Sequence, residues 1–217
     1  MFIRRVFGVL ITGFGVATLI TASLLAAQQP AKPATGHKMA MDEGMGMKKM
    51  TKAEKIANAT SAAPPSVSAK AQVLDWPAKE GDAPEVLRAG SNGWTCLPDI
   101  PFTKGNDPAC MDETWMKWVE AYLAHKAPVI TRVGFAYMTG AGGGWGSNSD
   151  PYGMKETADN HWAHHNPHVM VLVPDLKSLA GISTDPNNGG PYVMYEGTPY
   201  AHIMAPIASG MSMSSMK

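Results

Sequence analysis

The sequence has 217 residues, of which 45% are hydrophobic and 17% are charged, with 18 basic and 18 acidic side chains. This composition is typical of a globular chain with one domain. The balanced charge argues against nucleic acid as a partner, because nucleic-acid binding requires a surplus of Lys and Arg.

The first 27 residues have the pattern of a signal peptide. Arg4 and Arg5 precede an uncharged apolar run from Val6 to Ala27, as in a secretory signal. We expect cleavage after Ala27 and a periplasmic or secreted product. The run is also long enough to cross a bilayer, so an uncleaved signal would anchor the chain. No other membrane contact is predicted.

Two segments lack the apolar periodicity that a buried core requires. Residues 28–50 are rich in Met, Lys, Pro and Gly and predict a flexible linker, and residues 208–217, rich in Met and Ser, predict a disordered tail. The globular domain is therefore expected over residues 51–207. At its start, Thr51 opens a capping-box pattern, Thr-Lys-Ala-Glu, for a short helix that ends before Pro64.

Cys96 and Cys110 both follow the export signal and are expected to form a disulfide in an oxidising compartment. A redox-active pair is the weaker alternative, because a Cys-x-x-Cys spacing is absent. Between two strand-like runs, Ser91-Asn92-Gly93 favours the positive φ angles of a tight hairpin. The disulfide then connects the second of these strands to the region before the next helix.

That next helix has the clearest pattern in the chain. Asp112 can cap its start and Pro128 lies beyond its end. The large apolar positions that recur at helical spacing are Met111, Trp115, Trp118, Tyr122 and Leu123. We expect this stripe to pack in the core rather than to serve as an aromatic platform for a ligand.

The remaining elements are expected to be strands. They cover residues 129–138, 168–174, 192–197 and 201–206, and the glycine-rich loop 139–153 follows the first of them. The ratio of strands to helices predicts an α+β fold in a single domain. We expect a mainly antiparallel sheet with one long amphipathic helix packed on a face.

Several strings in the chain resemble a family of exported bacterial proteins of uncharacterised activity. The matching strings are DWPAKEG, NGWTC, GNDPAC and STDPNNGGPYVMYEGTPYAHIM, and the likeness covers about residues 51–207. It implies an exported single-domain protein and no particular reaction. His168 and His202 lie in stretches that fit the family, whereas the crowded His161, His164 and His165 depart from it.

Two His-x-Met stretches predict a metal site. Because residues two apart in a strand face the same side, His168 with Met170, and His202 with Met204, each present an imidazole and a thioether on one face. If the two strands are neighbours, these four side chains form a site for monovalent copper, which soft thioether ligands select. The alternative is that the methionines fill gaps in the core.

Three further histidines, His161, His164 and His165, are expected as secondary ligands. Their spacing with His168 suits zinc as well as copper, although Asn166-Pro167 excludes a helix there. A solvated loop is the alternative. Methionines in the two flanking segments, with His37, also indicate capture of copper or silver; they are Met39, Met41, Met45, Met47, Met50, Met211, Met213 and Met216.

Residues 185–196 partly match a calcium-binding loop. Asp185, Asn187 and Glu196 occupy ligand positions of that pattern, but Gly189 replaces an expected Asp or Asn. The flanks predict strands rather than helices. A plain hairpin turn on Asn-Asn-Gly-Gly is therefore the favoured interpretation, with calcium as the alternative.

These patterns predict an exported cell-envelope protein that binds a metal ion, most readily copper, without catalysis. The alternatives are an exported hydrolase-like enzyme and a small-molecule or sugar-binding module, both using the Gly-rich and His-rich loops. Motifs for a nucleophile elbow, a phosphate-binding loop and a His-Glu-x-x-His zinc site are absent from the sequence. The sequence leaves the question of enzymatic activity open.

Overall fold

The computed structural model describes residues 50–77, 79, 82–100, 103–140 and 143–207. The chain divides into two units, Met1–Lys38 and Met39–Lys217, and every described residue belongs to the second. The predicted signal peptide, the predicted tail and all of the predicted linker except Met50 lie outside the described residues. Among the described helices, none has the length and apolar character needed to cross a membrane.

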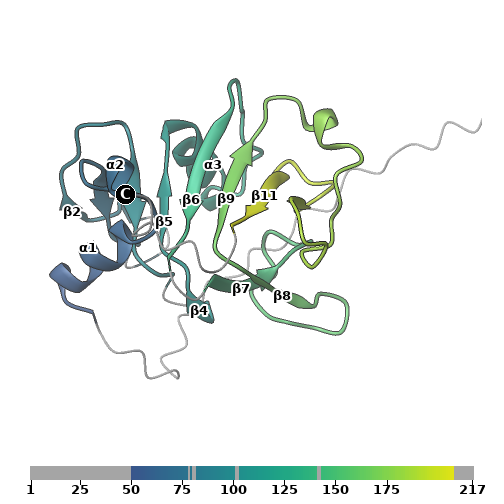
Figure 1. Cartoon of the computed structure of the whole chain (residues 1–217), viewed down its shortest axis with the longest axis horizontal. Coiled ribbons are helices and arrows are strands. Elements are labelled where there is room, and N and C mark those ends of the chain that lie inside the picture. Colours follow the sequence, from purple (N-terminus) through teal and green to yellow (C-terminus); the bar gives the residue numbers. More distant parts are fainter. Residues whose placement is uncertain (1–49, 78, 80–81, 101–102, 141–142, 208–217) are drawn as a thin grey trace, which may run out of the picture. The chain divides into compact units, whose positions relative to one another are not determined.

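The main sheet has eight strands in the order β10-β11-β9-β6-β5-β3-β1-β2. Neighbouring strands pair antiparallel, except β1 with β3, which pair parallel. In chain order, these strands are β1 (Gln72–Leu74), β2 (Val86–Arg88), β3 (Thr95–Leu97), β5 (Ala109–Met111), β6 (Gly134–Met138), β9 (His168–Leu172), β10 (Tyr192–Met194) and β11 (His202–Pro206). Figure 1 shows β5, β6, β9 and β11 side by side in the middle of this unit.

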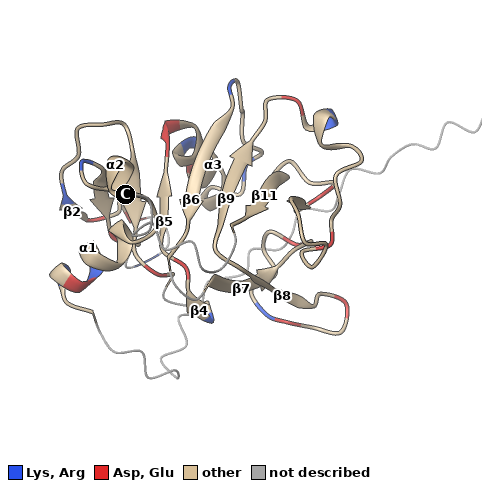
Figure 2. Ribbon diagram, in the orientation of Figure 1, with Lys and Arg blue, Asp and Glu red and all other residues tan. Residues whose placement is uncertain are grey.

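The central strands β6, β9 and β11 carry no charged residue, as the tan ribbons of Figure 2 show. Strands of this kind are suited to burial on both faces, or to lining an apolar cavity. The charged residues of Figure 2 lie mainly on loops and helices around these strands.

A second sheet has three antiparallel strands, β4 (Gly105–Asn106), β7 (Gly143–Ser147) and β8 (Trp162–His165), in the order β4-β7-β8. Strand β7 comes from the segment predicted to be a glycine-rich loop, and β8 comes from the histidine-rich segment. Only Asn166 and Pro167 separate β8 from β9 of the main sheet. The histidine-rich segment, for which a solvated loop is the alternative to a metal site, therefore contains an ordered strand that is followed closely by β9.

Helices cover both faces of the main sheet. Helix α1 (Lys52–Thr60) begins with the predicted capping box at Thr51, and the short helix α2 (Pro65–Ser68) follows it. Helix α1 packs in one core cluster with Cys110, whereas α3 (Glu113–Leu123) packs in another cluster with Met111. Because successive residues of a strand face opposite sides, α1 and α3 lie on opposite faces. A 3₁₀ helix, η1 (Leu176–Leu179), contacts β11.

The α+β architecture and the mainly antiparallel sheet are confirmed. Asp112 caps α3 as predicted, since its carboxylate accepts hydrogen bonds from the backbone N–H groups of Thr114 and Trp115. Helix α3 has 11 residues, fewer than the long helix expected from the sequence.

The predicted disulfide is also present. Cys96 and Cys110 are bonded to each other and are direct partners in the antiparallel pair of β3 and β5. Both are fully buried in the cluster beneath α1. The bridge therefore connects two neighbouring strands of the core, which favours a structural role.

The predicted hairpin at Asn92-Gly93 is wrong. Gly93 has the expected positive φ of 76°, but β2 does not pair with β3, because β1 lies between them. The local signal identified the turn and not the strand partners. The glycine-rich turn near residue 189 differs similarly: β10, which follows it, pairs with β11 rather than with a strand before the turn.

Candidate functional site

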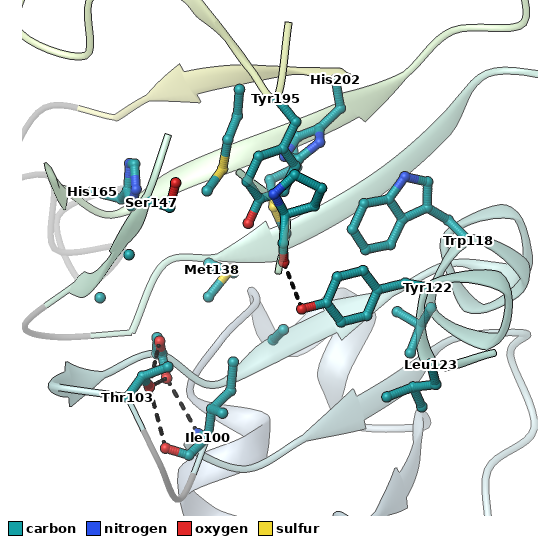
Figure 3. Close-up of a pocket in the computed structure, with 18 of the residues that line it drawn as sticks. Ile100, Thr103, Trp118, Tyr122, Leu123, Met138, Ser147, His165, Tyr195 and His202 are labelled. Carbon is teal, nitrogen blue, oxygen red and sulfur yellow. Dashed lines mark hydrogen bonds between the residues drawn. The ribbon is translucent and has the colours of Figure 1, made fainter. Parts of the chain in front are cut away.

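A cavity of about 820 Å³ lies over the face of the main sheet that α3 covers. Its floor consists of side chains from β5, β6, β9, β10 and β11, and its walls include α3 and the segments of β7 and β8. Figure 3 shows His165 and Met138 toward one side of it and His202 with Trp118 toward the other. Its size and mainly apolar lining are typical of a small-ligand site.

The strand register arranges histidines and methionines on the cavity floor in two groups. Met138 is directly opposite His168, and Met170 lies two residues farther along the same strand. Met194 is directly opposite His202, and Met204 lies two residues farther along that strand. All six side chains line the cavity. We call the first group the His168 cluster (His168, Met138, Met170) and the second the His202 cluster (His202, Met194, Met204).

The register of β9 and β11 shows how the four residues of the predicted copper site, His168, Met170, His202 and Met204, lie relative to one another. Met170 and Met204 are direct partners across β9 and β11, so the two thioethers lie side by side as expected. His202 lies opposite the Leu172 end of β9, however, four residues from His168. This offset separates the two histidine backbones by about 13 Å along the strands. The four residues thus share one face of the sheet, but the imidazoles belong to opposite ends of it.

Backbone carbonyls orient the imidazoles of both clusters. Nδ1 of His168 lies 2.5 Å from the carbonyl oxygen of Asn166, and Nδ1 of His202 lies 2.9 Å from that of Tyr200. Because a carbonyl only accepts, Nδ1 carries the hydrogen and Nε2 carries the lone pair. Nε2 of each ring is buried without a hydrogen-bond partner among the described residues. This is the arrangement in which an imidazole binds a metal or accepts a hydrogen bond from a ligand.

His165 is the third histidine on the cavity. Its Nδ1 lies 2.7 Å from the hydroxyl of Tyr192, and its Nε2 is also buried without a partner in the described part of the chain. Its ring centroid is 6.5 Å from that of His168. His165 is therefore the secondary candidate ligand that the structure brings close to the His168 cluster.

Burial keeps all three imidazoles neutral at physiological pH. It lowers the pKa of His165, His168 and His202 to about 4 each, against an ordinary value of 6.5. Hydrogen bonds to the backbone oppose this effect without reversing it. A neutral imidazole is the form that binds metals.

The other two candidate histidines lie outside the cavity. His161 is exposed, and its Nδ1 is 3.8 Å from a carboxylate oxygen of Glu156. The ring of His164 packs on Trp145, with 5.1 Å between ring centroids. Neither residue lines the cavity, so the structure does not bring them together with His168.

Helix α3 supplies an aromatic wall. Trp115 and Trp118 belong to the core, as predicted, but both also line the cavity. Each indole Nε1 is buried without a hydrogen-bond partner among the described residues. Tyr122 stacks on Trp118, with ring centroids 5.4 Å apart. The stripe therefore belongs to the core, as predicted, and also faces the cavity.

Tyr195 completes the wall from the end of β10. Its φ of 60° is in the left-handed region, which costs a residue with a Cβ about 1–3 kcal/mol. The ring it holds there is 5.6 Å from the ring of His202. Strain of this kind occurs preferentially at ligand sites.

The carboxyl of Asp107 lies at the edge of the cavity, with that of Asp99 beside it. Burial, together with the neighbouring Asp99, raises the pKa of Asp107 to about 7. The Asp107 carboxyl accepts hydrogen bonds from the backbone of Ile100 and the hydroxyl of Thr103, and Asp99 accepts one from the backbone of Asp107. Figure 3 shows Ile100 and Thr103 at this edge. These contacts fasten the loop before β5.

Residues 185–196, for which calcium binding is the alternative to a plain turn, contain a turn that is followed by β10. The Asp185 carboxylate accepts a hydrogen bond of 2.8 Å from the backbone N–H of Asn187, and Glu196 is exposed beyond β10. Across the described ranges, no group of three or more His, Cys, Asp or Glu side chains is positioned to hold a metal ion. The described residues thus provide neither the oxygen set that calcium requires nor the ligand set of a structural zinc site.

Sequence reasoning missed two members of the floor, Met138 and Met194. Both lie in predicted strands, 129–138 and 192–197, and are the last residues of β6 and β10. Their relation to His168 and His202 depends on the pairing of distant strands, which the sequence does not give. Comparisons with protein-family models, curated proteins and solved structures find no match. The family resemblance noted in the sequence therefore stays a prediction.

Proposed function

We propose that the protein is an exported, non-catalytic copper-binding protein that holds Cu(I) at the His168 cluster. The observation that carries the proposal is the register of β6 and β9, which groups one imidazole with two thioethers on the face of the sheet that lines the cavity. His165 supplies a second nitrogen beside this group. Its role as ligand is part of the proposal.

The chemistry of these side chains favours Cu(I) over harder cations. Thioethers are soft and neutral, and they select monovalent copper over zinc, calcium or magnesium. The imidazole of His168 is neutral, is oriented through Nδ1 and presents the Nε2 lone pair. The mainly apolar lining of the cavity suits these neutral ligands. Export to the cell envelope, predicted from residues 1–27, is consistent with this role.

The His202 cluster has a similar ligand set but different surroundings. The rings of Trp115 and Trp118 lie 5.0 and 5.7 Å from the ring of His202, and their buried indole N–H groups have no partner among the described residues. An N–H group presents the positive end of its dipole, which disfavours a cation nearby. We therefore assign copper to the His168 end of the floor.

Anaerobic titration with Cu(I) against a chromophoric competitor tests this proposal. The full chain is compared with the Met138→Leu/Met170→Leu variant, because leucine keeps the volume of methionine and removes the sulfur. Met116→Leu is the matched control, since Met116 packs against the same core but does not line the cavity.

The double variant is expected to lose one tight equivalent of Cu(I), and the control to lose none. Methionines in the flanking segments contribute equally to all three proteins, so the difference between them isolates the cavity site. Equal capacity and affinity in the three proteins would rule out the His168 cluster as the copper site.

A further inference from the structure

The rings of three buried side chains pack together at the end of the cavity away from His165 (Figure 3). Trp115, Trp118 and His202 have relative exposures of 2%, 8% and 2%. Trp115 and Trp118 are 5.1 Å apart between ring centroids, and each lies within 6 Å of His202. We call this group the indole corner; Figure 3 shows Trp118 and His202 together there.

The hydrogen-bonding roles in the indole corner are determined. Indole Nε1–H only donates, so Trp115 and Trp118 contribute two donors. His202 contributes an acceptor, because Nδ1–H is committed to the Tyr200 carbonyl at 2.9 Å and Nε2 carries the lone pair. None of these three nitrogens has a partner in the described structure. Leaving such groups unpaired costs free energy that a complementary ligand recovers.

A hydroxyl group complements this set. Its hydrogen is donated to one acceptor, here His202 Nε2, and its oxygen accepts from two donors, here the indole N–H groups. A carbonyl or ether oxygen accepts as well but leaves His202 unpaired. A carboxylate has no hydrogen to donate, and it would also bring a charge into the cavity.

The rest of the cavity lining favours a ligand in which the hydroxyl is attached to a neutral aromatic ring. The described lining residues include four acidic side chains and one lysine, Lys79, so an anion is disfavoured. The acidic residues are Asp82, Asp107, Glu120 and Asp150. The surface beside the corner consists of methionine thioethers and aromatic rings, which pack well on a flat ring. Phenols are neutral at pH 7, with a pKa near 10 as in tyrosine.

We propose that the indole corner is the binding site for the hydroxyl of a neutral phenol whose ring lies in the cavity. The volume of about 820 Å³ accommodates a substituted phenol. Apolar side chains at the cavity, Leu123, Trp145 and Met154, are 37–39% exposed and provide a route from solvent. This site is distinct from the His168 cluster and does not depend on copper.

Calorimetric titration of the metal-free full chain with three probes tests the proposal. The probes are 4-propylphenol, 4-propylanisole, which lacks the donor hydrogen, and propylbenzene, which lacks the oxygen. The phenol is expected to bind at least about tenfold more tightly than the ether, in line with a hydrogen bond to a buried acceptor. Equal affinities for the phenol and the ether, or no binding of the phenol at millimolar concentration, would overturn the proposal. Equal affinities are the result expected if a water molecule, rather than the ligand, pairs with the indole corner.

A separate NMR measurement locates the bound phenol in the protein. The chain has six tryptophans, and each gives one indole signal in a ¹H–¹⁵N correlation spectrum. Two signals, those of Trp115 and Trp118, are expected to move on addition of the phenol. They are assigned with Trp115→Phe and Trp118→Phe, which keep an aromatic ring and remove the donor. Unmoved indole signals at saturation would place the ligand elsewhere.

Trp118→Phe is also expected to weaken phenol binding about tenfold while changing propylbenzene binding much less. Trp145→Phe is the matched control, because Trp145 lines the cavity but is not part of the indole corner. An equal loss for both ligands in Trp118→Phe would show that the indole contributes only its surface. These measurements do not involve copper, so their results test phenol binding independently of the proposed function.

Discussion

The buried histidines make the stability of the metal-free protein depend on pH in a calculable way. His165, His168 and His202 have a pKa of about 4 in the folded chain and about 6.5 when unfolded. Between these values the unfolded chain binds three protons that the folded chain does not. The stability that these neutral histidines contribute is therefore complete above pH 6.5 and falls as the pH is lowered toward 4.

Asp107 acts in the opposite direction. Its pKa is about 7 in the folded chain, against 3.8 for an ordinary carboxyl, so the folded chain holds one proton in this window that the unfolded chain releases. The net difference is two protons. The free energy of unfolding should then decrease by about 3 kcal/mol for each pH unit between 6.5 and 4. A loss of about 7 kcal/mol over this window equals the whole stability of many domains.

Urea unfolding at several pH values, with a chelator present, measures this slope. His202→Gln should reduce it by about 1.4 kcal/mol per pH unit, because one of the titrating groups is removed. Met116→Leu, which removes no titrating group from the same core, is the control and should leave the slope unchanged. Stability that is constant or that increases as the pH falls from 6.5 to 4.5 would refute the reasoning.

Three further predictions concern the framework around the cavity. Replacing Cys96 and Cys110 with serine should lower the free energy of unfolding by about 3 kcal/mol, because the bridge closes a loop of about fifteen residues; an unchanged urea midpoint would contradict this. Asp112→Ala should cost about 2 kcal/mol in thermal unfolding, since the carboxylate accepts three backbone N–H groups, and a loss below about 0.5 kcal/mol would show that the cap is dispensable. Gly143→Ala should cost more than about 2 kcal/mol, because φ is 61° and a Cβ would lie 2.3 Å from a backbone oxygen of β8. Gly146→Ala, which meets nothing within 4 Å, should change stability by less than about 0.5 kcal/mol, and equal losses would contradict the close approach.

Local signals in the sequence predicted the parts of the fold that depend on neighbouring residues. The capping box at Thr51, the cap at Asp112 and the pairing of Cys96 with Cys110 are all confirmed. Each depends on hydrogen bonds within a few residues or on the chemistry of two unique side chains. The order of the strands depends instead on contacts between distant parts of the chain. For this reason the turn signal at Asn92-Gly93 predicted the wrong partner for β3.

The candidate site likewise has features that the local sequence predicts and features that depend on the packing of distant strands. Alternation along a strand correctly placed His168 with Met170, and His202 with Met204, on one face. The distance between the two imidazoles depends on the register of β9 against β11, which is set by packing along the whole sheet. Periodicity on α3 identified Trp115 and Trp118 as buried but carries no information on whether a buried indole N–H has a partner.

The copper assignment is tested most directly by X-ray absorption at the copper edge of the full chain loaded with one equivalent of Cu(I). Wild-type protein is expected to show two sulfur neighbours together with imidazole nitrogen, from Met138, Met170 and His168, with His165 as the additional nitrogen. The Met138→Leu/Met170→Leu variant is expected to lose the sulfur contribution of this site. Identical spectra for wild type and variant, or a first shell of nitrogen and oxygen alone, would contradict the account.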